Sequence, residues 1–254
     1  FKPEFPGVAE PRTGKSMGES CEDMAKTWQI TREDQDLLAY ESHQKAAAAY
    51  ARGFYADLVM PFRELSVDNI LRADTNLAKL ASLKPAFDKR SGKGTLTAGN
   101  STNLSDGASV ALLSSEQWAQ DNNKEIQAYL VDAQVAAVDF VAGEGLLMAP
   151  AWAVAQLLKR NNLKLQDFDF YEIHEAFAAQ VLCTLKAWES EEFCKTKLGM
   201  DGALGSIDRS KLNVVGSSLA LGHPFAATGA RIIANAAKLL KEKGQGRVLI
   251  SICT

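Results

Sequence analysis

The sequence predicts an α/β fold, in which helices pack on the faces of a β-sheet. From residue 122 onward, short β-branched or aromatic runs alternate with amphipathic helical stretches. A glycine-rich turn, residues 222–229, joins one such run to a helix. With 254 residues and 46% apolar side chains, the chain is long and apolar enough for one large or two ordinary domains.

The sequence pattern of the first 94 residues predicts helices separated by loops. A helix is expected over residues 17–28, and a longer one over residues 30–54. Thr31 begins the longer helix, because its hydroxyl can accept a hydrogen bond from the backbone N–H of Asp34. Gly53 stands where this helix is expected to end. His43 falls on a face that we expect to be solvated, so it is interpreted as a surface residue without chemistry.

The composition of the chain changes at residues 95–121. Alternation at residues 95–97 is followed by a polar loop of glycine, asparagine, serine and threonine, and then by the apolar run "ASVALL" at residues 108–113. The run fits either a strand or a buried helix. The loop fits a simple turn, and its small residues also fit close contact with a ligand.

The remainder predicts alternating strands and helices. Pro150 is expected in the first turn of one helix, and Gly244 is expected to end another, later helix. The elements expected, in order, are a strand at 126–140, a helix at 149–162, a strand at 168–173, a helix at 175–189, a strand starting at residue 212, a helix after the glycine-rich turn, and a strand at 247–254.

Composition excludes several classes of protein. A net charge of −3 does not favour binding to nucleic acid. The four cysteines form no C-x-x-C pair and no zinc spacing, so we expect reduced thiols and no metal site. No apolar run approaches the roughly 20 residues of a membrane span. Because the chain starts at Phe1 and stops within the strand-like "GRVLISICT", we expect a fragment of a longer protein.

Three side chains that can carry chemistry follow predicted strands. His174 follows residues 168–173, His223 lies in the glycine-rich turn, and Cys253 ends the last strand. Ligands of such sheets gather at the carboxyl ends of the strands, so the three are expected at one crevice. A thiol and two imidazoles suit acyl transfer. Taken singly, the histidines also fit structural roles and the cysteine an inert core thiol.

Several motifs together resemble the thiolase family, in particular the fatty-acid β-oxidation branch typified by the β-subunit of the trifunctional enzyme. They occur along essentially the whole chain: "MGESCEDMAKTWQITREDQDLLAYESHQKA", "GTLTAGNSTNLSDGAS", "YEIHEAFAAQ", "NVVGSSLALGHPFAATGARI" and "ISICT". The resemblance implies a layered α-β-α-β-α fold of two similar halves, each with a mixed five-stranded sheet, of which only part is present. It assigns residues 1–94 to a loop domain, 95–121 to a strand returning to the N-terminal half, and 122–254 to the C-terminal half.

The resemblance also implies roles for individual residues. His223 matches the histidine that activates the nucleophilic cysteine and lines an oxyanion hole, and Cys253 matches the acid/base cysteine. His174 stands where many thiolases carry asparagine, and is expected to stay neutral because of the following helix N-terminus. Ala98, Thr102 and Met17 match positions that contact the pantetheine arm of coenzyme A, and Phe177 is expected to shape the acyl pocket.

The activity implied is thiolytic cleavage of a 3-ketoacyl-CoA by CoA, giving acetyl-CoA and a shortened acyl-CoA. The alternatives are a biosynthetic acetoacetyl-CoA thiolase and a CoA-binding subunit without catalysis. No residue matches the nucleophilic cysteine, since Cys21 lies in the loop region, and the glycine run expected after Cys253 is missing. The chain alone is therefore expected to be inactive.

The resemblance implies no cofactor, with CoA acting as a substrate. It implies a homodimer, and a hydratase/dehydrogenase subunit as a partner in a β-oxidation complex. The expected location is the cytoplasm of a bacterium, or the mitochondrion if the source is eukaryotic.

Overall fold

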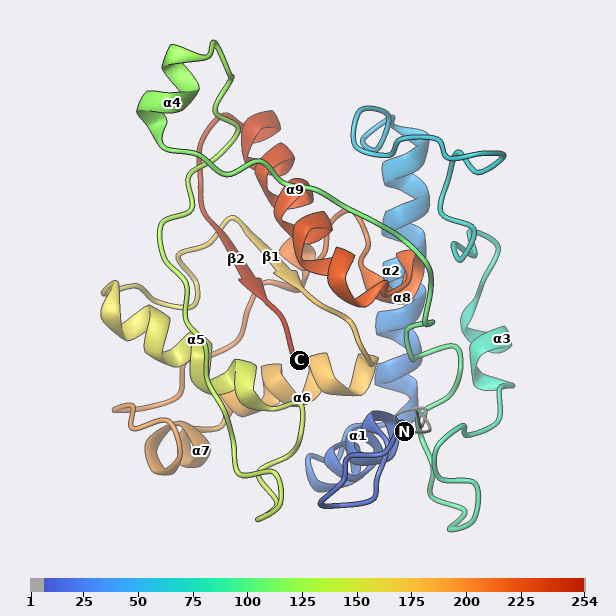
Figure 1. Ribbon diagram of the computed structural model, residues 1–254. Helices are drawn as coiled ribbons and strands as arrows, with labels where there is room; N and C mark the ends of the chain where they lie inside the picture. Colours follow the sequence, from blue (N-terminus) through green and yellow to red (C-terminus); the bar gives the residue numbers. More distant parts are fainter. Residues whose placement is uncertain (1–6, 254) are drawn as a thin grey trace, which may run out of the picture.

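A two-stranded parallel sheet lies at the centre of the computed structural model, which describes residues 7–253 (Figure 1). Strand β1 (Phe170–Ile173) pairs with β2 (Val248–Ser251), with Phe170 opposite Val248 and Ile173 opposite Ser251. Because the strands are parallel, their carboxyl ends meet at one edge of the sheet. His174 and Cys253 follow these ends, as the sequence predicts.

Helices surround the sheet. Helix α9 packs on both strands, and α6 packs against α1, α2, α5 and α7. No helix within residues 7–253 is long and apolar enough to cross a membrane. The helices are α1 (Met17–Thr27), α2 (Arg32–Ala51), α3 (Leu77–Ala81), α4 (Glu116–Asp121), α5 (Ala149–Arg160), α6 (Ala178–Glu189), α7 (Glu191–Thr196), α8 (Ser218–Leu221) and α9 (Phe225–Lys243), with one turn of 3-10 helix, η1, at Arg209–Lys211.

The helix ends follow the signals in the sequence. The Thr31 hydroxyl accepts from the Asp34 N–H at 3.1 Å, which confirms the predicted start of α2. Pro150 lies in the first turn of α5, and Gly244 ends α9 in the left-handed conformation at φ 88°. Helix α6 begins three residues later than predicted, because Ala176 lies in a bend and Phe177 is extended and forms a bridge to Ser101.

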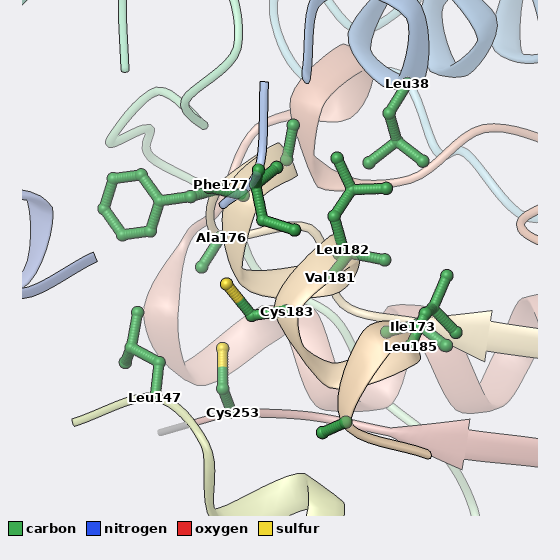
Figure 2. Close-up of a cluster of buried hydrophobic side chains, with 14 of the residues drawn as sticks. Leu38, Leu147, Ile173, Ala176, Phe177, Val181, Leu182, Cys183, Leu185 and Cys253 are labelled. Carbon is green, nitrogen blue, oxygen red and sulfur yellow. The ribbon is translucent and has the colours of Figure 1, made fainter. Parts of the chain in front are cut away.

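The main core is built around α6, which is buried on nearly all sides. Its apolar side chains pack with those of α1, α2 and the carboxyl ends of both strands (Figure 2). Trp188 is fully buried and donates its indole N–H to the Ala151 carbonyl at 3.3 Å. Burial of each large apolar side chain contributes about 1.5–3 kcal/mol, so this cluster is a main source of stability for the strand ends.

Three predicted strands are wrong. Residues 108–113 and 126–139 are coil, and Leu212 forms only a single bridge to Tyr171. Figure 1 shows the first two segments running as extended chain over the outside of the helices. Their apolar side chains are exposed, as at Val110 and Val131, 89% and 85% exposed. A strand forms only where a neighbour pairs with its backbone, and no segment within residues 7–253 pairs with these two.

The placement of His43 on a solvated face is also wrong. The side chain is only 6% exposed, and its Nδ1 accepts a hydrogen bond from the Arg72 N–H at 3.2 Å. Residues 54–82 cover this face of α2. Burial and the nearby Arg72 lower the pKa of His43 to about 4. A single helix pattern does not reveal that another segment covers the polar side of that helix.

Candidate active site

His174 lies at the end of β1 and is completely buried. Its backbone N–H donates to the Ser251 carbonyl of β2 at 2.9 Å, which continues the parallel ladder past the last paired residue. Asn213 completes the neighbouring backbone: its side chain accepts from the Ile173 N–H at 2.8 Å and donates to the Ile173 carbonyl at 2.9 Å. These contacts fix the direction in which the chain leaves β1, and with it the position of the imidazole.

His223 lies in the tight turn between α8 and α9. Gly222 precedes it at φ 83°, and a Cβ on this residue would lie 2.4 Å from the Ser105 hydroxyl, so both conformation and space require glycine. The turn is shorter than predicted. Helix α9 begins at Phe225, so Gly229 belongs to the helix rather than to the turn.

The loop of residues 100–105 joins the two histidine segments. Thr102 donates its N–H to the Ala176 carbonyl at 3.0 Å, on the segment that follows His174. The backbone N–H of His223 contacts the Asn103 carbonyl at 3.1 Å and the Ser105 hydroxyl at 3.0 Å. The polar loop that the sequence singled out therefore holds both histidines in place.

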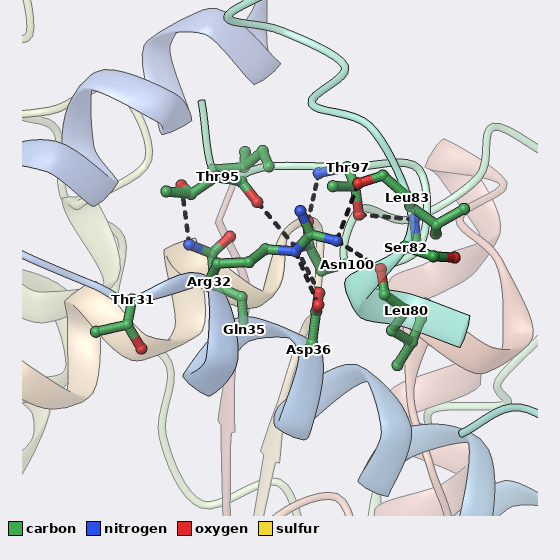
Figure 3. A network of polar contacts seen from close by, with 12 residues as sticks. Thr31, Arg32, Gln35, Asp36, Leu80, Ser82, Leu83, Thr95, Thr97 and Asn100 are labelled. Atoms are coloured by element: carbon green, nitrogen blue, oxygen red, sulfur yellow. Dashed lines mark hydrogen bonds and ion pairs between the residues drawn. The ribbon is translucent and has the colours of Figure 1, made fainter. Parts of the chain in front are cut away.

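A polar network anchors this loop to α2 (Figure 3). The Asn100 amide donates to the Asp36 carboxylate at 2.9 Å, and its oxygen accepts from the Thr97 N–H at 2.7 Å. Nε of Arg32 donates a hydrogen bond to the other oxygen of Asp36 at 2.8 Å. Asp36 and Asn100 are buried, so each bond is protected from competition with water.

The two imidazoles face each other, with ring centroids 4.2 Å apart. Nδ1 of His223 lies 2.7 Å from the Thr228 hydroxyl, which also donates to the Pro224 carbonyl at 3.2 Å. A hydroxyl has one proton, so Thr228 accepts from Nδ1–H of His223. Nε2 of His223 then keeps its lone pair, which is the form that a general base requires.

Both imidazoles are neutral near pH 7. Burial, with smaller contributions from His223 and Arg231, lowers the pKa of His174 to about 3. Burial and Arg231 also lower the pKa of His223. The predicted neutral state of His174 agrees with this, and its main cause is burial, with contributions from His223 and Arg231.

Cys253 lies in the main core, where its thiol is directed toward that of Cys183 (Figure 2). Burial raises the pKa of Cys253 to about 12, so the thiol is protonated near pH 7. Within residues 7–253 no hydrogen bond joins this thiol to either imidazole. The structure therefore brings the two histidines into contact and places Cys253 at the same end of the sheet without direct contact.

The four residues assigned to CoA and acyl binding lie in two environments. The Thr102 hydroxyl donates to the Ser218 carbonyl at 2.7 Å, close to the histidines. Ala98 and Met17 are exposed, and Phe177 is 8% exposed, with its ring edge-on to Phe87 at 5.8 Å. A cavity of about 290 Å³ beside α1 is lined by other residues, including 140, 141 and 143–146.

Sequence reasoning missed the residues that support the histidines. Ser218 contacts Nδ1 of His174, Thr228 contacts His223, and Glu175 binds the segments around both. The only signal was their position beside the histidine motifs. A serine in a short run of small residues does not reveal, without the fold, that its hydroxyl faces an imidazole 44 residues away.

Glu172 of β1 gives a prediction for stability against pH. The carboxyl group is 1% exposed, neither oxygen has a hydrogen-bond partner within residues 7–253, and burial raises its pKa to about 8. Between pH 4.5 and 8 the folded state keeps a proton that the unfolded state has lost, so the free energy of unfolding falls as pH rises. We expect Glu172→Gln to remove this loss, which is on the order of a few kcal/mol.

The measurement is urea unfolding at pH 5, 7 and 9. The variant is expected to match the parent near pH 5 and to exceed it at pH 9. Glu189→Gln changes the same charge at an exposed position of α6 and serves as the control. Parallel pH curves for the parent and Glu172→Gln would show that Glu172 is ionised in the folded protein.

Comparison with protein families gives two matches that together span nearly all of the chain. Residues 3–117 match the thiolase N-terminal domain, and residues 124–254 match the thiolase C-terminal domain. The division predicted at residues 94 and 121 is not tested by these ranges and stays a prediction.

Individual proteins agree with these matches. The chain is 45% identical to a 3-ketoacyl-CoA thiolase of Enterobacter sp. (strain 638), over 99% of this chain and 58% of that protein. A 3-ketoacyl-CoA thiolase of Yersinia pestis (strain Pestoides F) is 44% identical with the same coverage. The chain thus spans about 58% of the length of these curated relatives.

Solved structures show the same fold. The acetyl-CoA acetyltransferase of Bacillus anthracis superposes with a TM-score of 0.78 at 36% identity, over 97% of this chain and 59% of that one. Human mitochondrial 3-ketoacyl-CoA thiolase superposes with a TM-score of 0.78 at 29% identity, over 97% and 58%. The two-stranded sheet described here is part of that larger α/β architecture. With both domain families matched along the sequence, the chain belongs to the thiolase family.

Proposed function

We propose that the protein carrying this chain is an acyltransferase that cleaves 3-ketoacyl-CoA with CoA, giving acetyl-CoA and a shortened acyl-CoA. The observation that carries the proposal is the pair of neutral imidazoles 4.2 Å apart, each held through Nδ1 by a hydroxyl. The name 3-ketoacyl-CoA thiolase, shared by relatives at 44–45% identity, supports the same activity.

In this proposal His223 acts as the general base. Its unprotonated Nε2 takes the proton of a nucleophilic cysteine, which the thiolase resemblance implies and which we infer to lie outside these 254 residues. The cysteine sulfur attacks the 3-keto carbon, and cleavage of the Cα–Cβ bond releases the enolate of acetyl-CoA. His174 donates a hydrogen bond to the enolate oxygen, which disperses the developing charge.

Cys253 acts as the acid and then as the base. Its pKa of about 12 keeps the thiol protonated near pH 7, and the thiol gives this proton to the much more basic α-carbon of the enolate. The resulting thiolate removes the proton of the attacking CoA thiol, and the CoA sulfur then displaces the cysteine from the acyl group. The Cys253 thiol is thereby regenerated, and His223 returns its proton to the departing cysteine sulfur. No metal or redox cofactor enters the proposal, and CoA is a substrate.

Thr102, Ala98 and Met17 are proposed to contact the pantetheine arm of CoA, and Phe177 to bound the acyl pocket. The hydrogen bond from Thr102 to the Ser218 carbonyl supports a place for the arm close to the histidines. A homodimer, a hydratase/dehydrogenase partner, and a cytoplasmic or mitochondrial location are parts of the same proposal.

Activity against chain length separates this proposal from a biosynthetic acetoacetyl-CoA thiolase. We expect the full-length protein to cleave 3-ketoacyl-CoA substrates with acyl chains beyond four carbons, with kcat/KM at least equal to that for acetoacetyl-CoA. The measurement is the loss of 3-ketoacyl-CoA absorbance on addition of CoA, over a series from four to sixteen carbons. Activity confined to four carbons would support the biosynthetic alternative.

A CoA-binding subunit without catalysis is the other candidate. The mass of the intact protein and the length of its reading frame decide between this candidate and the proposed enzyme. A cysteine at a strand–helix junction upstream of residue 1 supports catalysis. A product of these 254 residues alone, which binds CoA without turnover, would replace the enzyme proposal by this one.

A further inference from the structure

Three polar side chains, Arg231, Ser218 and His174, form a hydrogen-bonded row. Nη2 of Arg231 on α9 donates to the Ser218 hydroxyl on α8 at 2.8 Å. That hydroxyl lies 2.8 Å from Nδ1 of His174. Ser218 and His174 are both completely buried, so water does not compete for these bonds. The row joins two helices to the end of β1.

Counting protons along this row fixes the tautomer of His174. All nitrogens of arginine donate, so the Ser218 hydroxyl accepts from Arg231. Its single proton then needs an acceptor, and Nδ1 of His174 is the acceptor in range. The opposite arrangement, with a proton on Nδ1, would direct two donors at Ser218 and leave the serine proton without a partner in a buried site, at a cost of about 1–3 kcal/mol.

The other nitrogen of the same ring has no partner. Nε2 of His174 is buried and forms no hydrogen bond to any described residue. A neutral imidazole with Nδ1 as acceptor carries its proton on Nε2. Nε2–H of His174 is therefore a buried donor without an acceptor among the described residues, in a ring tilted by 46° against that of His223.

We propose that Ser218 and Arg231 are positioning residues that hold His174 in the Nε2–H tautomer, so that this N–H is the donor presented to the thioester or enolate oxygen of the substrate. The choice of oxygen rests on the proposed function, whereas the tautomer rests on the hydrogen bonds alone. The two histidines then carry their protons on opposite nitrogens. Thr228 leaves Nε2 of His223 free as a base, and Ser218 leaves Nε2 of His174 protonated as a donor.

Arg231 has a second effect on this pair. Its Nε and Nη1 are buried without hydrogen-bond partners within residues 7–253, and the Glu172 carboxyl that its charge acts on has a pKa of about 8 and is mostly protonated at pH 7. This charge opposes protonation of both imidazoles. A cation that also polarises the Ser218 hydroxyl makes that hydroxyl a stronger donor to Nδ1.

The direct test is the tautomer itself. Two-bond ¹H–¹⁵N correlation spectra of the full-length protein, labelled with ¹⁵N in histidine side chains, distinguish Nδ1–H from Nε2–H rings by their cross-peak patterns. The peaks of His174 are those lost in His174→Asn. We expect the Nε2–H pattern in the wild type and a gain of the Nδ1–H form in Ser218→Ala. A wild-type His174 with the Nδ1–H pattern would overturn the proposal without the need for any Ser218 variant.

Ser217→Ala is the matched control. Ser217 is the neighbouring residue, is also completely buried, and its hydroxyl has no hydrogen-bond partner within residues 7–253. This variant removes the same atom from the same turn, so we expect the wild-type pattern for His174. An equal change in both variants would mean that packing of the turn, rather than the Ser218 hydroxyl, sets the tautomer, and would contradict the proposal.

Kinetics test the role in turnover. We expect Ser218→Ala to lower kcat by about tenfold or more and to leave KM within about twofold, since a donor that acts in the transition state affects kcat. In a His174→Asn background the carboxamide supplies a donor without a tautomer, so adding Ser218→Ala should lower kcat by less than about twofold. An equal loss in both backgrounds would show that Ser218 does not act through His174.

The outcomes separate the two proposals. A wild-type protein with the Nε2–H pattern but no thiolysis of any 3-ketoacyl-CoA would refute the proposed function and retain the tautomer assignment. An active wild type with the Nδ1–H pattern at His174 would retain the function and refute the positioning role. Arg231→Lys keeps the charge and loses the planar donor group, and we expect a change in the same direction as Ser218→Ala.

Discussion

Replacing His223 with alanine is expected to lower the turnover of 3-ketoacyl-CoA by the full-length protein by about three orders of magnitude or more. The change removes the general base, a contribution of roughly 10²–10⁴-fold, together with a polar group beside the substrate oxygen. The measurement is steady-state thiolysis with CoA in excess. Turnover near the wild-type rate would remove His223 from the catalytic role proposed for it.

His223→Gln separates the two functions of the side chain. Its amide can still donate a hydrogen bond but has no basic nitrogen, so we expect a loss almost as large as that of alanine. The imidazole is only partly buried, and its ring contacts only His174, Phe225 and the Thr228 hydroxyl among the described residues, so both variants should unfold within a few degrees of the wild type. A large drop in the unfolding temperature would instead attribute the loss of activity to the fold.

The second large effect is expected from Glu175, the residue after His174. Its buried carboxylate accepts hydrogen bonds from the Ser42 hydroxyl at 2.7 Å, the Asn213 amide at 2.6 Å and the Leu219 N–H at 3.2 Å. It therefore joins α2, the segment before α8, and α8 itself. Glu175→Ala leaves three buried donors without an acceptor, and we expect the free energy of unfolding to fall by roughly 3–5 kcal/mol.

Urea unfolding at pH 7 measures this loss. Glu175→Gln keeps the shape and one acceptor oxygen, so its loss should be smaller than that of alanine. Glu192→Ala, at an exposed position of α7, removes the same functional group and should change stability by less than about 0.5 kcal/mol. A loss below 1 kcal/mol for Glu175→Ala would mean that these three donors find other acceptors.

Local signals in the sequence predicted the elements that depend on local physics. The cap at Thr31, the proline in the first turn of α5 and the left-handed glycine after α9 are each decided by a few neighbouring residues, and each is confirmed. Strands β1 and β2 lie within the predicted ranges 168–173 and 247–254, although both are shorter and residue 254 lies outside the described residues. Their parallel pairing brings His174 and the chain leading to Cys253 to one edge.

Predictions that depended on contact with a distant segment of the chain were wrong. Residues 108–113 and 126–139 have the composition of strands, yet no described segment pairs with them. His43 has a polar neighbourhood in sequence, yet residues 54–82 bury it. Strand formation and burial depend on a second segment that pairs with the first or covers it. The sequence of the first segment alone does not show whether such a partner is present.

The sequence by itself determined the α/β class, the family resemblance, and His174 and His223 as the residues to examine. Only the tertiary structure decided what each imidazole can do, because a tautomer is set by the group that faces Nδ1. That group is Ser218 for His174, 44 residues away along the chain and held by Arg231 of another helix. The neutral state of His174 likewise comes chiefly from its complete burial in the fold, which the sequence around it does not reveal.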